Sequence, residues 1–318
     1  MSKLHLWGCL LLVLLGGTAC VRSYPQDGTP PPLAVSTPKE GVPADVPSAA
    51  ATSQGTPLSP QGLPTPAPQI PPASRPVPYA VVLVDRDSAL NLRSAPSLSA
   101  PALALLPYDA RNLVPTGNRR EADGQTWVEI ESEYGNGWVS AAFLSRQVSE
   151  DVVCGDSRVQ ALVDAFVQAV QQGDGAALAS LVSPVHGLTV RHEWWNPPQT
   201  FSVSQVRTLF EDQTSYDWGI QDGSGMPLQG SFAEIILPRL QEVATAEFVT
   251  VCNSLENGLA TGGTAGLVTW PYPNMPFIAL YRPAPADSEL DWRTWALGIV
   301  WDNGRPYLAA LIQYHWEV

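Results

Sequence analysis

Lysine is almost absent from the chain: of its 17 Lys and Arg residues, only Lys3 and Lys39 are lysines. The net charge is −13, and charged residues make up 15% of the sequence. Nucleic acids are bound through clusters of Lys and Arg, so this balance excludes a nucleic-acid-binding protein. Hydrophobic residues make up 45% of the 318 positions, which allows two domains with sizeable cores.

Several motifs that carry chemistry are also missing. The sequence has no HExxH pattern, no Cys/His pairs at zinc spacing and no GxSxG nucleophile elbow. Beyond the N-terminus, no apolar run is long enough to span a bilayer. These absences predict a protein with no metal site and no cofactor.

The first twenty residues, MSKLHLWGCLLLVLLGGTAC, have the pattern of a secretory signal peptide. Lys3 precedes a short apolar run, and small residues follow it. The ending GTAC resembles a bacterial lipoprotein cleavage box, which implies lipidation of Cys20 and a lipid-anchored protein outside the cytoplasm. An ordinary cleaved signal remains the alternative. Acyl chains on Cys20 would hold the protein at a membrane surface.

Residues 21–78 consist largely of Pro, Ala, Ser, Thr, Gly and Gln, and they carry 16 of the 31 prolines. The segment has no apolar periodicity, so it cannot bury enough surface to offset chain entropy. We therefore expect a disordered, extended tether that separates the folded part from the membrane.

Residues 79–147 have the pattern of a small all-β barrel, because short apolar runs alternate with turn residues. In the run TWVEIE, Trp127, Glu129 and Glu131 alternate with Val128 and Ile130, so one face of this strand should contact water.

Three motifs in this segment resemble the bacterial Src-homology-3-like (SH3b) family. LNLRSAPS is similar to its LNVRSGPS-type opening, and TWVEIE followed by GWVSAAFL is similar to its closing pattern. Ala95 stands where the family usually has glycine. The resemblance implies a non-catalytic module that binds peptidoglycan peptides or another envelope protein. Its landmark positions are Asn91, Arg93, Trp127 and Trp138, and a purely structural role is the alternative for each of them.

Residues 154–318 begin with helical patterns and end with strands, which predicts an α+β domain with a curved antiparallel sheet. Asp156 and Asp174 are expected N-caps, and Gly173 is an expected helix end. A DNG turn near the C-terminus predicts a hairpin between two strands that are apolar on both faces. Trp295, Leu297, Ile299 and Trp301 should point one way, with Ala296 and Val300 pointing the other way.

The order of these elements resembles the nuclear transport factor 2-like superfamily, and local segments resemble uncharacterised secreted bacterial domains. The superfamily resemblance implies a cone-shaped pocket, which would serve as a small-ligand carrier or as a hydrolase- or isomerase-type enzyme. The candidates for general acid–base chemistry in it are His192, Asp217, Asp291 and His315, with Glu193 beside them. Half-buried histidines with local hydrogen bonds are the alternative.

Cys154 and Cys252 are the remaining cysteines after Cys20 and the signal peptide. An even pair outside the cytoplasm predicts a disulfide, and two buried thiols are the alternative.

The stretch SYDWGIQDGSGMPLQGSF, residues 215–232, contains a string typical of calcium loops. Its spacing fails the EF-hand pattern in both registers. Ser231 and Glu234 have capping-box spacing, so the stretch is interpreted as a glycine-rich turn before a capped helix. Pro238 predicts that this helix stops early or kinks.

Overall fold

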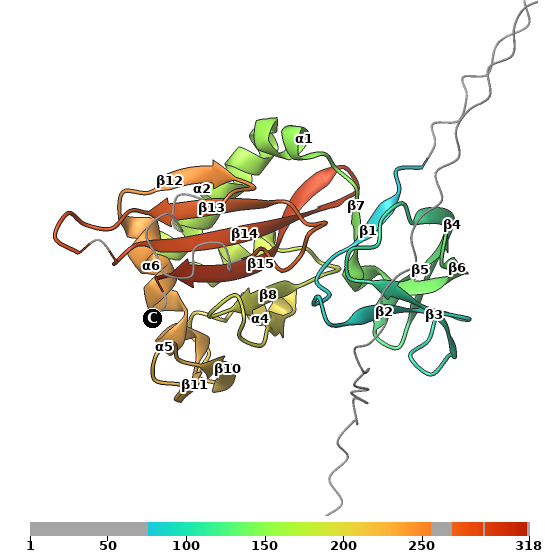
Figure 1. The fold of residues 1–318 in the computed structure, drawn as a ribbon, viewed down its shortest axis with the longest axis horizontal. Helices are drawn as coiled ribbons and strands as arrows, with labels where there is room; N and C mark the ends of the chain where they lie inside the picture. The colour runs from blue at the N-terminus through green and yellow to red at the C-terminus, as the bar shows by residue number, and fades with distance from the viewer. Residues whose placement is uncertain (1–75, 256–268, 289, 317–318) are drawn as a thin grey trace, which may run out of the picture. The chain divides into compact units, whose positions relative to one another are not determined.

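The computed structural model describes residues 76–255, 269–288 and 290–316 (Figure 1). These residues fall in one compact unit. The expected signal peptide, Cys20 and the tether up to residue 75 lie outside the described residues. Within the described part of the chain, no helix is long and apolar enough to cross a membrane.

The described chain is mostly β, with mainly antiparallel sheets and six α-helices. Its first part, residues 79–146, forms a five-stranded antiparallel sheet in the order β3-β2-β6-β5-β4, while β1 pairs with β7. The elements are β1 (Tyr79–Val81), β2 (Ala89–Arg93), β3 (Ala102–Pro107), β4 (Val114–Ala122), β5 (Gln125–Ser132), β6 (Gly135–Ser140), a 3₁₀ turn (Ala141–Phe143) and β7 (Leu144–Arg146).

The core of this first part is built from residues that alternate along its strands. Leu92, Ile130 and Val139 have no exposed surface and belong to one apolar cluster. On the face of β5 that alternates with Val128 and Ile130, Glu129 is half-buried and Glu131 is exposed, whereas Trp127 is enclosed and only 1% exposed. Its Nε1 donates a hydrogen bond to the carbonyl of Ala122. Alternation assigns a side chain to a face of a strand, but it does not reveal whether neighbouring chain covers that face.

The second part is a six-stranded sheet in the order β12-β13-β14-β15-β8-β9, in which only the β15–β8 pair is parallel. Its helices are α1 (Glu150–Gly155), α2 (Ser157–Gln172), α3 (Gly175–Leu181), α4 (Val203–Val206), α5 (Phe232–Ile235) and α6 (Leu237–Thr245). Its strands are β8 (Leu188–Arg191), β9 (Gln199–Phe201), β10 (Tyr216–Ile220), β11 (Pro227–Gly230), β12 (Val249–Cys252), β13 (Phe277–Arg282), β14 (Arg293–Asp302) and β15 (Arg305–His315).

The helix ends follow the local signals in the sequence. The carboxylate of Asp156 accepts a hydrogen bond from the backbone N–H of Arg158 at the start of α2, and Asp174 caps α3 in the same way. Gly173 ends α2 in the left-handed conformation, with φ 64°. A residue without Cβ adopts this conformation at little cost, so the expected glycine stop is confirmed.

The stretch 215–232 contains a hairpin that was not expected from the sequence. Strands β10 and β11 pair on either side of the DGSG turn, and the indole of Trp218 is buried and donates to the carbonyl of Gly230. The capping box of Ser231 and Glu234 is present. The helix then ends, and α6 begins with Pro238 in its first turn, as the position of this proline predicts.

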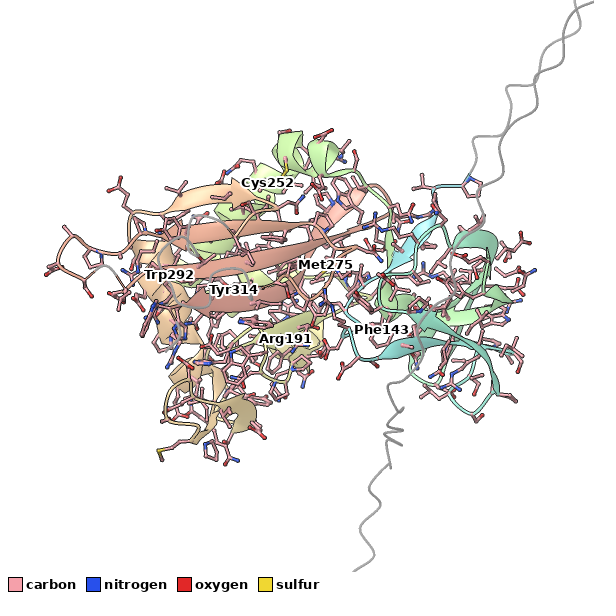
Figure 2. The ribbon with its side chains drawn as sticks, viewed as in Figure 1. Phe143, Arg191, Cys252, Met275, Trp292 and Tyr314 are labelled. Atoms are coloured by element: carbon pink, nitrogen blue, oxygen red, sulfur yellow. A yellow bond between two sulfur atoms is a disulfide. The ribbon has the colours of Figure 1, made fainter. Side chains whose placement is uncertain are left out.

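The hairpin of β14 and β15 forms the centre of the second part, and both of its faces are buried as expected. The alternation of β14 places Trp295, Leu297 and Ile299 in the apolar cluster shared with α2, α3 and α6. Ala296 and Val300 belong to a second cluster on the opposite face. Met275, Trp292 and Tyr314, labelled in Figure 2, are further members of this second cluster.

Polar contacts join the two parts. His186 is buried between them, and its two ring nitrogens lie 2.7 Å from the Ser183 hydroxyl and 2.8 Å from the Leu144 carbonyl. Burial lowers the pKa of His186 to about 4, so the ring is neutral near pH 7. Arg191 of β8 is also buried and pairs with Asp85, which precedes β2.

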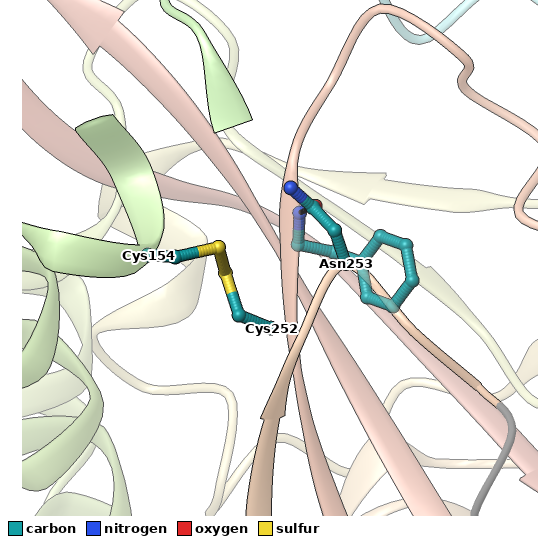
Figure 3. Close-up of a disulfide and its surroundings, with 4 residues drawn as sticks. Cys154, Cys252 and Asn253 are labelled. Carbon is teal, nitrogen blue, oxygen red and sulfur yellow. Dashed lines mark hydrogen bonds between the residues drawn. A yellow bond between two sulfur atoms is a disulfide. The ribbon is translucent and has the colours of Figure 1, made fainter. Parts of the chain in front are cut away.

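Cys154 of α1 and Cys252 of β12 form a disulfide, with their Cα atoms 5.7 Å apart (Figure 3). The two residues are separated by 98 positions in the sequence. The bond therefore ties the first helix of the second part to the edge strand of its sheet.

The disulfide should contribute substantially to stability. Replacing both cysteines, as Cys154→Ala with Cys252→Ala, should lower the free energy of unfolding by up to about 4–5 kcal/mol, because a long loop is released in the unfolded chain. Urea denaturation of both proteins measures this difference. Reductant should weaken the native chain by a similar amount and leave the double variant unchanged. Equal midpoints for the native chain with and without reductant would contradict the prediction.

Candidate ligand pocket at the end of the central hairpin

A polar pocket of about 340 Å³ lies beside α6, where β14 begins and where β8 and β15 end. This volume is at the lower end of the range for small-molecule sites. The pocket is lined by His192, Glu193, Gln221, Asp222, Arg239, Arg293, Gln313, His315 and Trp316.

Strand register brings these side chains together. Arg293 is directly opposite His315, and Trp295 is opposite Gln313, in the β14–β15 pair. Because side chains two apart share a face, Arg293, Gln313 and His315 all lie on the helix-covered face. The parallel β8 runs along β15, with Arg191 level with Ile312. His192 and Glu193, which follow β8, therefore lie beside the last residues of β15.

Glu193 is the central group of the pocket, and it has no exposed surface. Its Oε1 lies 2.5 Å from Nε2 of His315. Nδ1 of His192 lies 3.1 Å from the same oxygen, although its orientation is not that of a hydrogen bond. Nδ1 of His315 lies 2.7 Å from the carbonyl of Trp316, which can only accept. Both nitrogens of His315 therefore face acceptors, as in a charged imidazolium paired with a carboxylate.

The pKa shifts agree with this ion pair. Burial alone would raise the pKa of Glu193, but the contacts with His192 and His315 lower it below its usual value. Burial alone would lower the pKa of His315, but the hydrogen bond and charge of Glu193, together with the Trp316 carbonyl, raise it. Each partner thus stabilises the charged form of the other.

Two arginines border the pocket from the helix side. Arg293 lies 3.2 Å from Glu242 and 3.7 Å from Asp291. Arg239 of α6 is half-buried, and its Nη1 donates to the carbonyl of Ile235.

Two buried polar side chains in the pocket lack partners among the described residues. Gln313 is 0% exposed, and neither its amide oxygen nor its amide nitrogen makes a hydrogen bond. His192 is 4% exposed; its Nε2 has no partner, and its Nδ1 has only the 3.1 Å contact with Glu193, which is not a hydrogen bond. An unpaired buried polar group costs about 1–3 kcal/mol, so this layer destabilises the ligand-free protein.

The structure unites some of the expected site residues and not others. His192 and His315 meet through Glu193. Asp217 lies exposed on β10, where its side chain accepts from the backbone N–H of Gly219. Asp291 pairs with Arg282 at 3.1 Å and does not line the pocket.

Arg239, Arg293 and Gln313 belong to the pocket but were missed from the sequence. A usable signal was the i, i+2 spacing of Gln313 and His315 on one face of an otherwise apolar strand. For Arg239 there was no such signal, because its helix reaches the pocket only through tertiary packing.

The four SH3b-like landmark residues lie in the sheet of the first part and do not line the polar pocket. Arg93 donates to the carbonyl of Ala100 at 2.7 Å and is paired across strands with Trp138. Asn91 is paired with Leu105 of the edge strand β3. Asn91, Arg93 and Trp138 are half-buried, whereas Trp127 is enclosed.

Comparison with known proteins gives no family for this chain, because no family model and no curated protein matches it. In the described ranges, no group of three or more His, Cys, Asp or Glu side chains is arranged to hold a metal ion. The functional assignment therefore depends on the geometry of the pocket.

The His315–Glu193 pair should impose a defined pH dependence. The raised pKa of His315 adds stability below about pH 6.5, which is lost as pH rises through the folded value. The lowered pKa of Glu193 adds stability above about pH 4.5, which is lost as pH falls through the folded value. The pair therefore contributes most between these pH values.

Glu193→Gln should abolish this dependence. Without the carboxylate, burial dominates, and the pKa of His315 should fall below its usual value; NMR titration of the histidine ring protons measures it. His186 serves as an internal control, because its pKa should stay near 4 in both proteins. An unchanged His315 titration would contradict the ion pair.

Proposed function

We propose that the chain is an exported envelope lipoprotein whose second part binds a small polar molecule in the His192–Glu193–His315 pocket. The observation that carries the proposal is this pocket, whose polar lining includes buried groups without protein partners. A cavity with few, convergent polar groups is the usual form of a small-molecule site.

The contacts of His315 favour binding over catalysis. A general acid or base must exchange a proton with the ligand through an accessible nitrogen or oxygen atom. Both ring nitrogens of His315 already have partners, and Nδ1 of His192 faces the Glu193 carboxylate at 3.1 Å. The pocket is thus better suited to hold a ligand than to transform it.

The remaining parts of the chain would export the protein, anchor it and hold the binding domain away from the membrane. In the proposal, residues 1–20 direct export, Cys20 carries the lipid anchor in the membrane, and residues 21–78 form the tether. Residues 79–147 form the SH3-like barrel. Residues 154–318 form the α+β domain; the expected order of helices first and sheet after them is wrong in detail, because β8 and β9 of the sheet precede α4, α5 and α6. The signal pattern, the proline content and the SH3b motifs support these assignments.

A second binding function is favoured by a row of side chains on the first part. Directly paired residues share a face, so Leu105 lies with Asn91, and Arg93 lies with Trp138 and Glu129. Leu105 is exposed on β3, which is an edge strand of its sheet. We propose that this row binds peptidoglycan or an envelope protein.

If the pocket serves a ligand, removing one of its unpaired polar side chains should stabilise the folded protein. Gln313→Leu should raise the free energy of unfolding by about 1–3 kcal/mol, because it removes an unpaired buried amide at similar volume. It should also remove any small-molecule adduct seen by native mass spectrometry of the full chain purified from its envelope. Urea denaturation measures the first effect.

Gln147→Leu is the matched control for this variant. The Gln147 amide donates to the carbonyl of Tyr79 at 3.3 Å, so its loss should destabilise the protein. If Gln313→Leu also destabilises the protein, and no adduct is found, the pocket does not serve a ligand.

The row on the first part predicts retention of the full chain on purified peptidoglycan. Trp138→Ala should reduce the retained fraction at least about fivefold, since truncation of an aromatic at the centre of an interface costs about 1–2 kcal/mol or more. Leu98→Ala, which also truncates an exposed apolar side chain of this part, should leave retention unchanged. Equal retention of both variants would reject this surface.

A further inference from the structure

Most charged side chains around the ligand pocket form two balanced sets, and Arg239 and Asp222 lie outside both sets. Arg282 and Arg293 contact Glu242 and Asp291, with distances of 2.8–3.7 Å. Two guanidinium groups thus face two carboxylates, and this network is neutral as a whole. It also holds Arg293 in place at the pocket wall.

The imidazolium of His315 and the carboxylate of Glu193 form the second balanced set. Arg239 belongs to neither set, and among the described residues it forms no ion pair. The one hydrogen bond of its side chain goes to the backbone carbonyl of Ile235. Burial lowers the pKa of Arg239, and the charge of Arg293 lowers it further, against smaller opposing effects of Glu193 and Glu242. A half-buried guanidinium without a counter-ion is costly to maintain.

Asp222 limits the charge that the pocket can accept. Its carboxylate lines the same pocket and already has an interaction within the protein. A ligand with several negative charges would meet repulsion from Asp222 and Glu193. A single negative charge, by contrast, would match the one guanidinium that has no counter-ion.

The unpaired buried groups form an independent indication of a ligand. Gln313 and His192 line the pocket with amide and imidazole atoms that have no protein partner. The pocket therefore combines the guanidinium of Arg239 with uncharged polar atoms. This combination suits a small anion that also carries a polar group.

We infer that the pocket recognises a small organic monoanion, of the carboxylate class, through the guanidinium of Arg239. The planar guanidinium matches a carboxylate with two parallel hydrogen bonds, and such charge-assisted bonds are about twice as strong as neutral ones. Arg239 is then the specificity-determining residue, while Glu193 is a positioning residue that keeps His315 charged and oriented. This inference rests on the proposed ligand-binding function and adds the chemical class of the ligand.

The test compares carboxylates with their neutral amides on the full chain. Acetate, lactate and pyruvate are titrated by calorimetry at constant ionic strength, beside acetamide, lactamide and inorganic phosphate. We expect at least one carboxylate to bind at least about tenfold more tightly than its amide and than phosphate. Arg239→Gln should weaken carboxylate binding at least about tenfold. Arg207→Gln, which removes the same charge from an exposed site on the second part, should not.

Each other outcome overturns the inference in a recognisable way. Equal binding of an amide, unaffected by Arg239→Gln, would leave the ligand pocket standing and reject the anion. Preferential phosphate binding would replace the carboxylate class with a phosphate class. Carboxylate binding that survives Arg239→Gln would reject the role of Arg239. If no probe binds while the native chain still carries a small-molecule adduct that Gln313→Leu removes, only the carboxylate class fails; if the adduct is also missing, the proposed function fails with it.

Discussion

The pairing of β14 with β15 is the constraint on which the rest of the second part depends. Both faces of this hairpin are buried, so a slip of one residue would exchange its two apolar clusters. A bulge after Gly298 adjusts the register, and a Cβ at this glycine would lie 2.6 Å from Met275 and 2.9 Å from Ala310. The same register places Arg293 opposite His315, so one strand pairing fixes both the packing of the core and the positions of the pocket residues.

The pocket itself is a local departure from good packing. Burying the carboxylate of Glu193 carries a desolvation cost, which its contacts with His315 and His192 must offset. Gln313 and His192 add unpaired polar atoms in a region where apolar side chains would be more stable. Such departures are typical of functional sites, because the groups that receive a ligand are unsatisfied without it.

Sequence patterns predicted local structure well wherever the deciding contacts are close along the chain. The caps at Asp156 and Ser231, the glycine stop at Gly173 and the DNG hairpin all depend on residues within a few positions of one another. The β10–β11 hairpin was missed, because glycines and a proline mask the alternation of its short strands. Alternation along β5 could not show that Trp127 is enclosed, because the groups that cover it, such as the Ala122 carbonyl, lie outside its own strand.

The sequence alone determined the helix caps and the local turns, the two-sided burial of the hairpin and the presence of histidines near the ends of β8 and β15. It could not decide which carboxylate joins them, since Glu193, Asp217 and Asp291 were equally plausible by spacing. Tertiary structure selected Glu193 and excluded Asp217, which stays exposed on β10, and Asp291, which pairs with arginines. It alone brought Arg239 to the pocket. The physical reason is that a parallel strand pair joins Glu193 to His315, 122 positions away, and a helix packed across a sheet brings Arg239 to both; no local pattern encodes such contacts.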